Sequence, residues 1–221
     1  MFEGFENVLT NLGSYFKDMT NPVTIITIIT LVTVVVLLLA TRKKSGYTTK
    51  TLTYGAILIS ISFILSMIKF PMPQGGSITP ASMLPIFIFA YIAGWRAGII
   101  AGICYGILQF IQAPYFYHPI QFLLDYILAF GLLGFAGILR KNINYIVLIC
   151  IIGGLLRFIC HYVSGVVFFA SYAPKGQSVY LYSLLYNGAY MLPETIICVV
   201  LAIGMLILPG LRAAVDKAKM Q

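Results

Sequence analysis

Residues 154–172 read GLLRFICHYVSGVVFFASY, an apolar run that carries one arginine, one histidine and two tyrosines. Arg157 and His161 are four residues apart, so they share one face of a helix. The same face continues through Ser164, Gly165, Phe168 and Tyr172. Charged side chains are costly in hydrocarbon and normally face the interior of a helix bundle or a cavity. The stretch therefore predicts a membrane helix whose polar face is a candidate functional site.

The whole chain has the composition of an integral membrane protein. Of its 221 residues, 60% are hydrophobic and 9% charged, and the mean hydropathy is +0.96. Soluble domains contain about a quarter charged residues. Several apolar runs reach about 20 residues, the length that a helix needs to cross a bilayer. We therefore expect an all-α membrane protein with no sizeable soluble domain.

The charge and the cysteines exclude other classes. The net charge is +8, but the basic residues lie in short loops and not in the single patch that a nucleic-acid surface needs, so no nucleic-acid partner is expected. The four cysteines lie inside apolar runs without the paired spacing of a zinc or dithiol site. We interpret them as buried structural thiols and expect no metal site.

Loop signals divide the chain into four parts. Residues 1–21 have the pattern of an amphipathic helix at the membrane interface, and residues 22–50 comprise an additional transmembrane helix with a basic loop. Residues 51–211 form a six-helix membrane domain, and residues 212–221 form a basic tail. The six helices are expected at residues 51–70, 83–95, 97–111, 119–139, 143–172 and 179–208. The run 143–172 would be about 45 Å long, so we expect it to tilt, break or project.

The basic residues predict the orientation. With seven spans, ten of the fourteen lysines and arginines fall on one side of the membrane, namely Arg42, Lys43, Lys44, Lys50, Arg96, Arg140, Lys141, Arg212, Lys217 and Lys219. Cytoplasmic loops carry an excess of such residues. This side, with the C-terminus, is expected to be cytoplasmic, and the N-terminus and the loops 71–81, 112–118 and 173–178 are expected outside.

Counting residues along the helices compares the depths of the polar groups. Arg157 and Glu194 both lie about 23 Å below the outer ends of their spans. Because buried charges are usually partnered, we interpret them as a structural ion pair below the ligand-facing residues. Asp125 lies nearer the outside, and no basic residue on its own helix face can neutralise it. We therefore expect it to need a cation.

Other polar groups converge on the same outer half of three consecutive helices. They are His161, Tyr182, Tyr186, Asn187 and Tyr190. Carboxylate, imidazole, amide and phenols suit a small, cationic, aromatic molecule. Structural roles are the alternatives: a helix histidine satisfied within the bundle, and tyrosines that anchor helix ends at the interface.

Catalytic motifs are missing from the sequence. It contains no GxSxG, no HExxH and no GxxxxGK[ST] phosphate loop. We therefore expect no enzyme, and any ATP energy for transport must come from a partner.

Four motifs point to a known family: Ala93-Gly-Trp-Arg-Ala-Gly98; His118-Pro with Leu124-Asp-Tyr-Ile-Leu-Ala-Phe-Gly131; His161 through Phe168-Phe-Ala-Ser-Tyr-Ala-Pro174; and Tyr182 with Asn187-Gly188. Over residues 51–211 they resemble the thiamine-specific S components of energy-coupling factor (ECF) transporters. The resemblance implies a six-helix S-component bundle, here with one extra N-terminal transmembrane helix. It implies a bacterial plasma-membrane protein that captures thiamine from outside, with no resident cofactor. A transmembrane coupling subunit and two ATPase subunits would be its partners.

The resemblance also implies binding residues. Asp125 resembles the family's acidic ligand, usually a glutamate, with Tyr126 beside it. His161, Tyr182 and Asn187 match a histidine, a tyrosine and an asparagine of the family. Phe169 stands where a family tryptophan can stack on the substrate. The loop 71–81, the expected lid, lacks the tryptophan that the family can contribute there.

The resemblance implies a docking surface as well. S components use an Ala-x-x-x-Ala pattern on the first core helix to dock on the coupling subunit, and the nearest match here is Ala56-x-x-x-Ser60. Two alternatives stay open. One is an S component for another heterocyclic vitamin, and the other is an intramembrane enzyme or a self-sufficient transporter.

Overall fold

The computed structural model describes residues 47–73 and 75–220. The predicted amphipathic segment 1–21 and the additional helix within residues 22–50 lie outside the described residues, except for residues 47–50. The described helices, in order, are α4 (Thr49–Met67), α5 (Leu84–Ala93), α6 (Trp95–Gln112), α7 (Pro119–Phe122), α8 (Ala129–Phe135), α9 (Ile146–Phe168), α10 (Val179–Ile207) and α11 (Pro209–Ala218). A two-stranded antiparallel hairpin of β1 (Phe70–Pro71) and β2 (Ser77–Ile78) connects α4 to α5.

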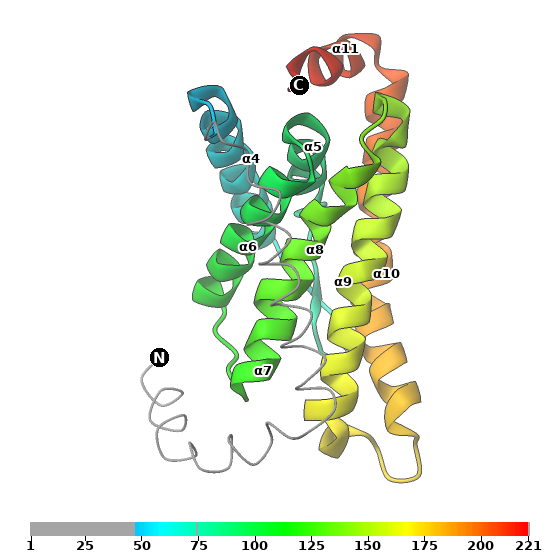
Figure 1. Ribbon diagram of the computed structural model, residues 1–221. Coiled ribbons are helices and arrows are strands. Elements are labelled where there is room, and N and C mark those ends of the chain that lie inside the picture. Colours follow the sequence, from blue (N-terminus) through cyan, green and yellow to red (C-terminus); the bar gives the residue numbers. More distant parts are fainter. Residues whose placement is uncertain (1–46, 74, 221) are drawn as a thin grey trace.

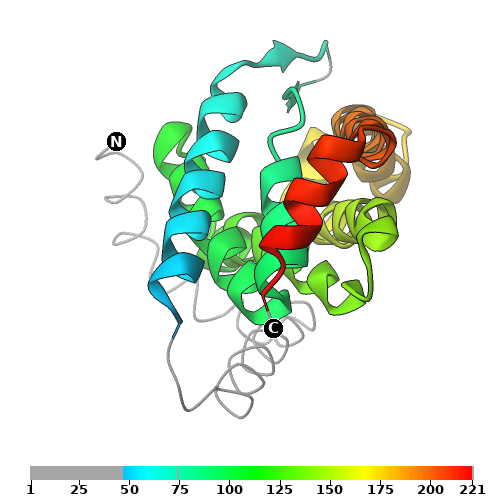
Figure 2. The ribbon, with the colours of Figure 1, turned by 90° about the horizontal axis from the view of Figure 1, so that it is seen from above.

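The helices form an elongated bundle in which α9 and α10 pack side by side along their length (Figure 1). Viewed along the bundle, α4 and α10 lie at opposite sides, and α11 crosses the end (Figure 2). The short helix α5 packs against α4, α6, α8 and α9. Its side chains Ile86, Phe87 and Tyr91 are fully buried. The core of the bundle is therefore built around α5.

The outer surface is apolar, as a bilayer requires. Within the described part of the chain, four helical segments are long and apolar enough to cross a membrane, namely Thr49–Met67, Pro119–Leu139, Ile143–Phe168 and Val179–Ile207. Large apolar side chains point outward along them, and Leu192 in the middle of α10 is 63% exposed. The prediction of an all-α membrane protein is confirmed.

Glycines bring α6 and the α7–α8 segment into backbone contact. A Cβ atom added to Gly102 would lie 2.1 Å from the carbonyl oxygen of Phe130, and one added to Gly106 would lie 1.9 Å from that of Tyr126. No side chain fits at such distances. The four-residue glycine spacing thus fixes the helix that carries Asp125 and Tyr126 directly against α6.

The segment 119–139 is not the regular helix that its apolar run predicts. His118 Nδ1 accepts the backbone N–H of Ile120 and caps α7, which begins at Pro119. A π-helical turn (Leu123–Leu128) then separates α7 from α8, and a 3₁₀ turn (Ala136–Leu139) ends the segment. Hydropathy cannot distinguish these turns from α-helix. The π turn carries Asp125, and such turns often occur at functional sites.

Two further expectations concern the later helices. The long run 143–172 breaks, as expected: a 3₁₀ turn (Ile143–Tyr145) precedes α9, and another (Ala170–Tyr172) follows it. Most of the segment that is expected as a basic tail, from residue 212, forms the end of α11. Val215 and Ala218 of α11 are buried against the bundle, which is why this segment folds back.

Candidate substrate-binding pocket

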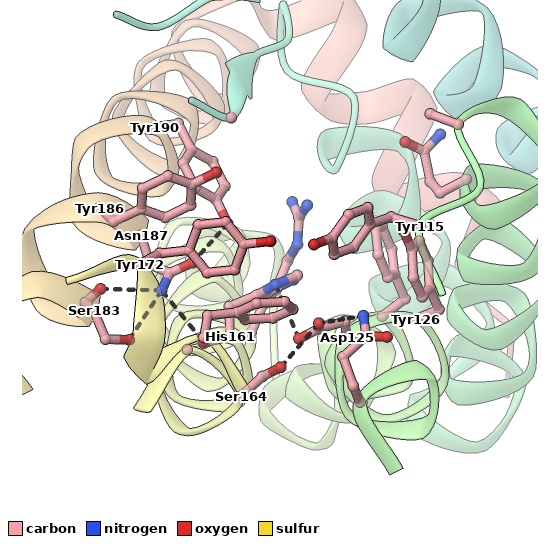
Figure 3. A pocket seen from close by; sticks show the side chains of 18 of the residues that line it. Tyr115, Asp125, Tyr126, His161, Ser164, Tyr172, Ser183, Tyr186, Asn187 and Tyr190 are labelled. Carbon is pink, nitrogen blue, oxygen red and sulfur yellow. Dashed lines mark hydrogen bonds and ion pairs between the residues drawn. The ribbon is translucent and has the colours of Figure 1, made fainter. Parts of the chain in front are cut away.

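A cavity of about 510 Å³ lies between α9, α10 and the α7–α8 segment (Figure 3). Helix α7 and the start of α10 lie at the end of the bundle opposite α11 (Figure 1). The walls of the cavity combine aromatic rings with a few polar groups. They are formed by Gly76, Gln109, Ala113, Tyr115, Gln121, Asp125, Tyr126, Phe130, Arg157, His161, Ser164, Gly165, Phe169, Tyr172, Tyr182, Ser183, Tyr186, Asn187 and Tyr190. The volume and lining are those of a site for a small aromatic molecule.

All six residues predicted as substrate ligands line this one cavity. They are Asp125, Tyr126, His161, Phe169, Tyr182 and Asn187. They come from three helical segments that are consecutive in the chain, so the fold brings together what the sequence separates by more than 60 residues. In Figure 3, Asp125 and Tyr126 face Asn187 and Tyr186 across the cavity.

Asp125 is buried at 8% exposure and is held on one side only. Its Oδ2 accepts hydrogen bonds from Gln121 Nε2 at 2.7 Å and from Ser164 Oγ at 2.9 Å. Its Oδ1 lies 3.3 Å from His161 Nδ1 and has no hydrogen-bond partner among the described residues. One oxygen of this carboxylate thus lacks a hydrogen-bond donor among the described residues, and the group nearest to it is the imidazole that approaches from α9.

Arg157 belongs to the cavity as well as to an ion pair. Its Nη1 lies 3.2 Å from Glu194 Oε2, and its guanidinium carbon lies 4.5 Å from the centre of the Phe130 ring. The depth count predicted that Arg157 lies below the ligand-facing residues. Its side chain also lines the cavity, so it is not confined to that lower level. The rise per residue places the Cα atom, but a long side chain reaches about a helical turn farther.

Glu194 connects this ion pair to the loop between β2 and α5. The carboxylate is buried and accepts hydrogen bonds from Thr79 Oγ1 and, at 2.9 Å, from Ser82 Oγ. The backbone of the hairpin loop lies on tyrosines of α10. A Cβ atom added to Gly75 would lie 2.7 Å from the hydroxyl of Tyr186, and one added to Gly76 would lie 2.5 Å from the ring of Tyr190. Both glycines have positive φ, 101° and 72°. The loop is thereby anchored over one side of the cavity.

The amide of Asn187 is largely engaged within the bundle. Its Nδ2 donates to the carbonyl oxygens of Ser183 at 3.0 Å and His161 at 3.2 Å, and its Oδ1 accepts from Tyr190 at 2.8 Å. An amide oxygen accepts two hydrogen bonds, so one remains available toward the cavity. Asn187 thus also links α10 to the histidine-bearing turn of α9.

The mouth of the cavity contains residues that the sequence did not single out as ligands. Tyr115, from the loop 113–118, and Tyr172 direct their hydroxyls toward each other (Figure 3). The Tyr115 ring lies 5.8 Å from that of Phe169. Burial and then the hydrogen bond with Tyr172 raise the pKa of Tyr115 to about 12, so the phenol stays protonated near neutral pH. The sequence predicts only that the loop 112–118 lies outside, and the tertiary fold reveals its place at the cavity.

The residues predicted for docking on a partner lie away from the cavity. Ala56 and Ser60 are exposed on α4, one turn apart, beside large exposed residues such as Ile57 and Ile64. Among the described residues, no group of three or more His, Cys, Asp or Glu side chains could hold a metal ion.

The fold and the cavity define a class: a multi-helix membrane protein with an aromatic pocket for a small molecule. A family model described as thiamine transporter protein matches residues 52–211, about three quarters of the chain, so the chain belongs to this family. The family is one of transporters, in agreement with the prediction that the chain is not an enzyme.

Individual relatives agree. The thiamine transporter ThiT of Bacillus subtilis is 38% identical over 181 residues, which cover 74% of this chain and 93% of the relative. ThiT of Lacticaseibacillus paracasei is 31% identical over 179 residues, 72% of this chain and 89% of the relative. A solved structure of ThiT from Listeria monocytogenes matches with a TM-score of 0.63 at 31% identity, covering 73% of this chain and 96% of that chain.

Proposed function

We propose that this protein is the substrate-binding S component of an ECF-type transporter and captures thiamine from outside the cell. The observation that carries the proposal is Asp125 Oδ1, a buried carboxylate oxygen with no hydrogen-bond partner among the described residues, in a cavity walled by tyrosines and Phe169. Thiamine combines a cationic thiazolium ring with an aminopyrimidine. Aromatic faces suit the cation, and the carboxylate oxygen suits an N–H donor.

The proposed site consists of Asp125, Tyr126, His161, Phe169, Tyr182 and Asn187, all from the cavity wall. Phe169 and Tyr115 take the stacking role for which the loop 71–81 provides no tryptophan. The hairpin loop, anchored through Glu194, acts as the lid. Arg157 is held by Glu194, which keeps its positive charge compensated beside a cationic ligand.

The orientation and the domains follow from the charge distribution. Residues 51–211 form the substrate-binding membrane domain, residues 22–50 an additional membrane helix with its loop, and residues 212–221 a cytoplasmic end. Basic loops place α11 at the cytoplasmic side, so the cavity opens outward. The sequence has no phosphate-binding loop, so the chain does not bind ATP in that way. As an S component, it would rely for uptake on a transmembrane coupling subunit and two ATPase subunits. Ala56 and Ser60 on α4 are the proposed docking surface.

Calorimetric titration of the purified protein with thiamine tests the proposal. The chain has a single tryptophan, Trp95, which is not part of the cavity wall, so tryptophan fluorescence is a poor reporter. We expect saturable binding that Asp125→Asn weakens at least about tenfold, the size of one lost hydrogen bond to a charged group. Asp216→Asn, at the opposite end of the bundle, is the matched control and leaves affinity unchanged. No heat with thiamine, or equal binding by Asp125→Asn, would refute the site.

Two further measurements separate the alternatives. A panel of heterocyclic vitamins in the same titration distinguishes thiamine from another ligand of the same fold. Uptake into liposomes that contain this chain alone, without partner subunits, would contradict the S-component assignment and favour a self-sufficient transporter.

A further inference from the structure

A second cavity, of about 470 Å³, lies at the other end of the bundle from the thiamine pocket. It lies between the loop 140–142 on one side and, on the other, the end of α11 with the residues that follow this helix. Its lining residues are Arg140, Lys141, Asn142, Asp216, Lys219 and Met220. Asp216, Lys219 and Met220 lie beyond residues 52–211, the part of the chain that the family model matches.

The chain end is fastened to the bundle by specific contacts. The N–H of Met220 donates to the carbonyl oxygen of Ile92 at 2.8 Å, and Arg140 Nη1 donates to the carbonyl oxygens of Ile92 and Met220 at 3.0 and 2.9 Å. Tyr91 donates to Asp216 Oδ1 at 2.5 Å. The cavity is thus a built feature of the fold and not a gap beside a loose tail.

The three cations of this cavity outnumber its one carboxylate. Among the described residues, none of the three forms an ion pair: the pair of Arg157 with Glu194 and the contact of His161 with Asp125 both lie at the thiamine pocket. Arg140 is bonded to neutral carbonyl groups, and Lys219 Nζ donates to the carbonyl oxygen of Lys141 at 2.9 Å and lies over the Tyr91 ring. The one carboxylate in the lining, Asp216, is engaged by Tyr91. The cavity therefore carries a positive charge that an anion would complement.

The surroundings indicate a lipid and not a soluble anion. Leu211, Val215 and Ala218 form one row on α11, with spacings of four and three residues. Val215 and Ala218 are buried against the bundle. The side chain of Leu211 is 48% exposed, and that of the nearby Leu208 is 57% exposed. Figure 2 shows α11 running across the end of the bundle from α10. Exposed apolar side chains thus continue the row at the outer edge of the bundle, where a bilayer would begin.

We propose that the cavity between the loop 140–142 and α11 binds the phosphate of an anionic membrane lipid, with Arg140, Lys141 and Lys219 around the phosphate and Leu208 and Leu211 against the acyl chains. Anionic lipids are enriched in the cytoplasmic leaflet of a membrane. The basic loops indicate that this end of the bundle faces that leaflet. The bound lipid fixes α11 in the interface and ties the start of α4 to it, because Thr51 of α4 donates to the sulfur of Met220.

Titration of the purified full chain in detergent tests the proposal. The probes are short-chain phosphatidylglycerol, short-chain phosphatidylcholine and inorganic phosphate. Calorimetry measures the binding of each probe. We expect saturable binding of phosphatidylglycerol alone. Lys141→Gln and Lys219→Gln each weaken it about fivefold, the equivalent of about 1 kcal/mol per charge. Lys219→Arg retains binding because it retains the charge.

The controls keep the test independent of folding and of thiamine. Lys141 contributes only its backbone carbonyl to the fastening of the chain end, so Lys141→Gln leaves the fold intact. Lys69→Gln and Lys175→Gln each remove one charge near the opposite end and keep lipid affinity. Thiamine affinity stays unchanged in Lys141→Gln and Lys219→Gln, since these two residues lie at the other end of the bundle from the thiamine pocket. Equal binding of both lipids, equal affinity for inorganic phosphate, or undiminished binding by the Lys141 and Lys219 variants would overturn the proposal.

Discussion

Ser164 Oγ donates a 2.9 Å hydrogen bond to Asp125 Oδ2 and so ties α9 to the π turn of the preceding membrane segment. The same oxygen accepts from Gln121 one helical turn earlier, at 2.7 Å. Oδ1 has no hydrogen-bond partner in the described part of the chain. The protein thus fixes one oxygen of this carboxylate and leaves the other for a ligand.

Ser164→Ala is expected to weaken thiamine binding about tenfold, although the serine need not touch the ligand. The variant removes one of two donors that orient Asp125, and a hydrogen bond to a charged group contributes about 1.5 kcal/mol. Calorimetric titration measures the change. Ser171→Ala, on the exposed 3₁₀ turn after α9, is the control and keeps wild-type affinity. Unchanged binding by Ser164→Ala would mean that Asp125 is oriented by other contacts.

Oxythiamine, which has a carbonyl oxygen in place of the pyrimidine amine, tests what the free oxygen recognises. If Oδ1 accepts from the amine, the analogue sets a carbonyl against a carboxylate, and we expect it to bind at least about a hundredfold more weakly than thiamine. Asp125→Asn, which adds an N–H donor, should narrow this ratio. Similar affinities for both compounds would instead indicate that the carboxylate interacts with the thiazolium charge.

Much of the fold follows from the sequence because it depends on local and periodic properties. Hydropathy is additive along the chain, so the six helices expected between residues 51 and 208 agree with the described helical segments to within a few residues. Counting 1.5 Å per residue placed Arg157 and Glu194 at one depth, and their side chains lie 3.2 Å apart. Glycines that recur every fourth residue are typical of close backbone contact, and α6 makes such a contact through Gly102 and Gly106 with the segment that carries Asp125.

The remaining features depend on the approach of separate segments. The contact of His161 with Asp125 joins two helices, and the place of Tyr115 at the cavity mouth depends on where a loop folds. The π turn is invisible to a pattern of apolar residues. The helix α11 is stabilised by partners such as Tyr91 and Ile92, more than 100 residues away in the chain. None of these relationships has a signal within a single window of sequence.

Gly102→Ala is expected to destabilise the protein by about 1–3 kcal/mol, the cost of overpacking a close contact. Its Cβ would lie 2.1 Å from the Phe130 carbonyl oxygen, so α6 and α8 must separate. Gly204→Ala is a matched control, since Gly204 lies in α10 with no atom within 4 Å of an added Cβ. There alanine should be neutral or stabilise by up to about 1 kcal/mol. Thermal unfolding in detergent compares the two, and equal midpoints would disprove the contact.

The pair of Arg157 and Glu194 is expected to behave as a buried ion pair. Glu194→Leu should destabilise the protein by about 3–5 kcal/mol, because it leaves Arg157 unpaired and removes the acceptor of Thr79 and Ser82. The double variant Arg157→Met/Glu194→Leu should recover part of this loss. Thermal unfolding measures both, with Lys175→Met as the exposed control. A double variant less stable than Glu194→Leu would show that Arg157 stabilises the fold without its partner.

Tyr115 and Tyr172 are expected to control the rate of exchange at the cavity mouth. Their hydroxyls point toward each other across the mouth (Figure 3), so removing either one lowers a barrier that thiamine crosses in both directions. In Tyr115→Phe and Tyr172→Phe, the association and dissociation rates should rise together, by about three- to tenfold, the equivalent of one neutral hydrogen bond, and Kd should change little. Surface plasmon resonance measures both rates.

Tyr180→Phe is the control, because this tyrosine is 64% exposed and does not line the cavity. A rise in the dissociation rate alone would mean that the hydroxyls bind thiamine directly, because only a contact made in the complex slows release without slowing entry.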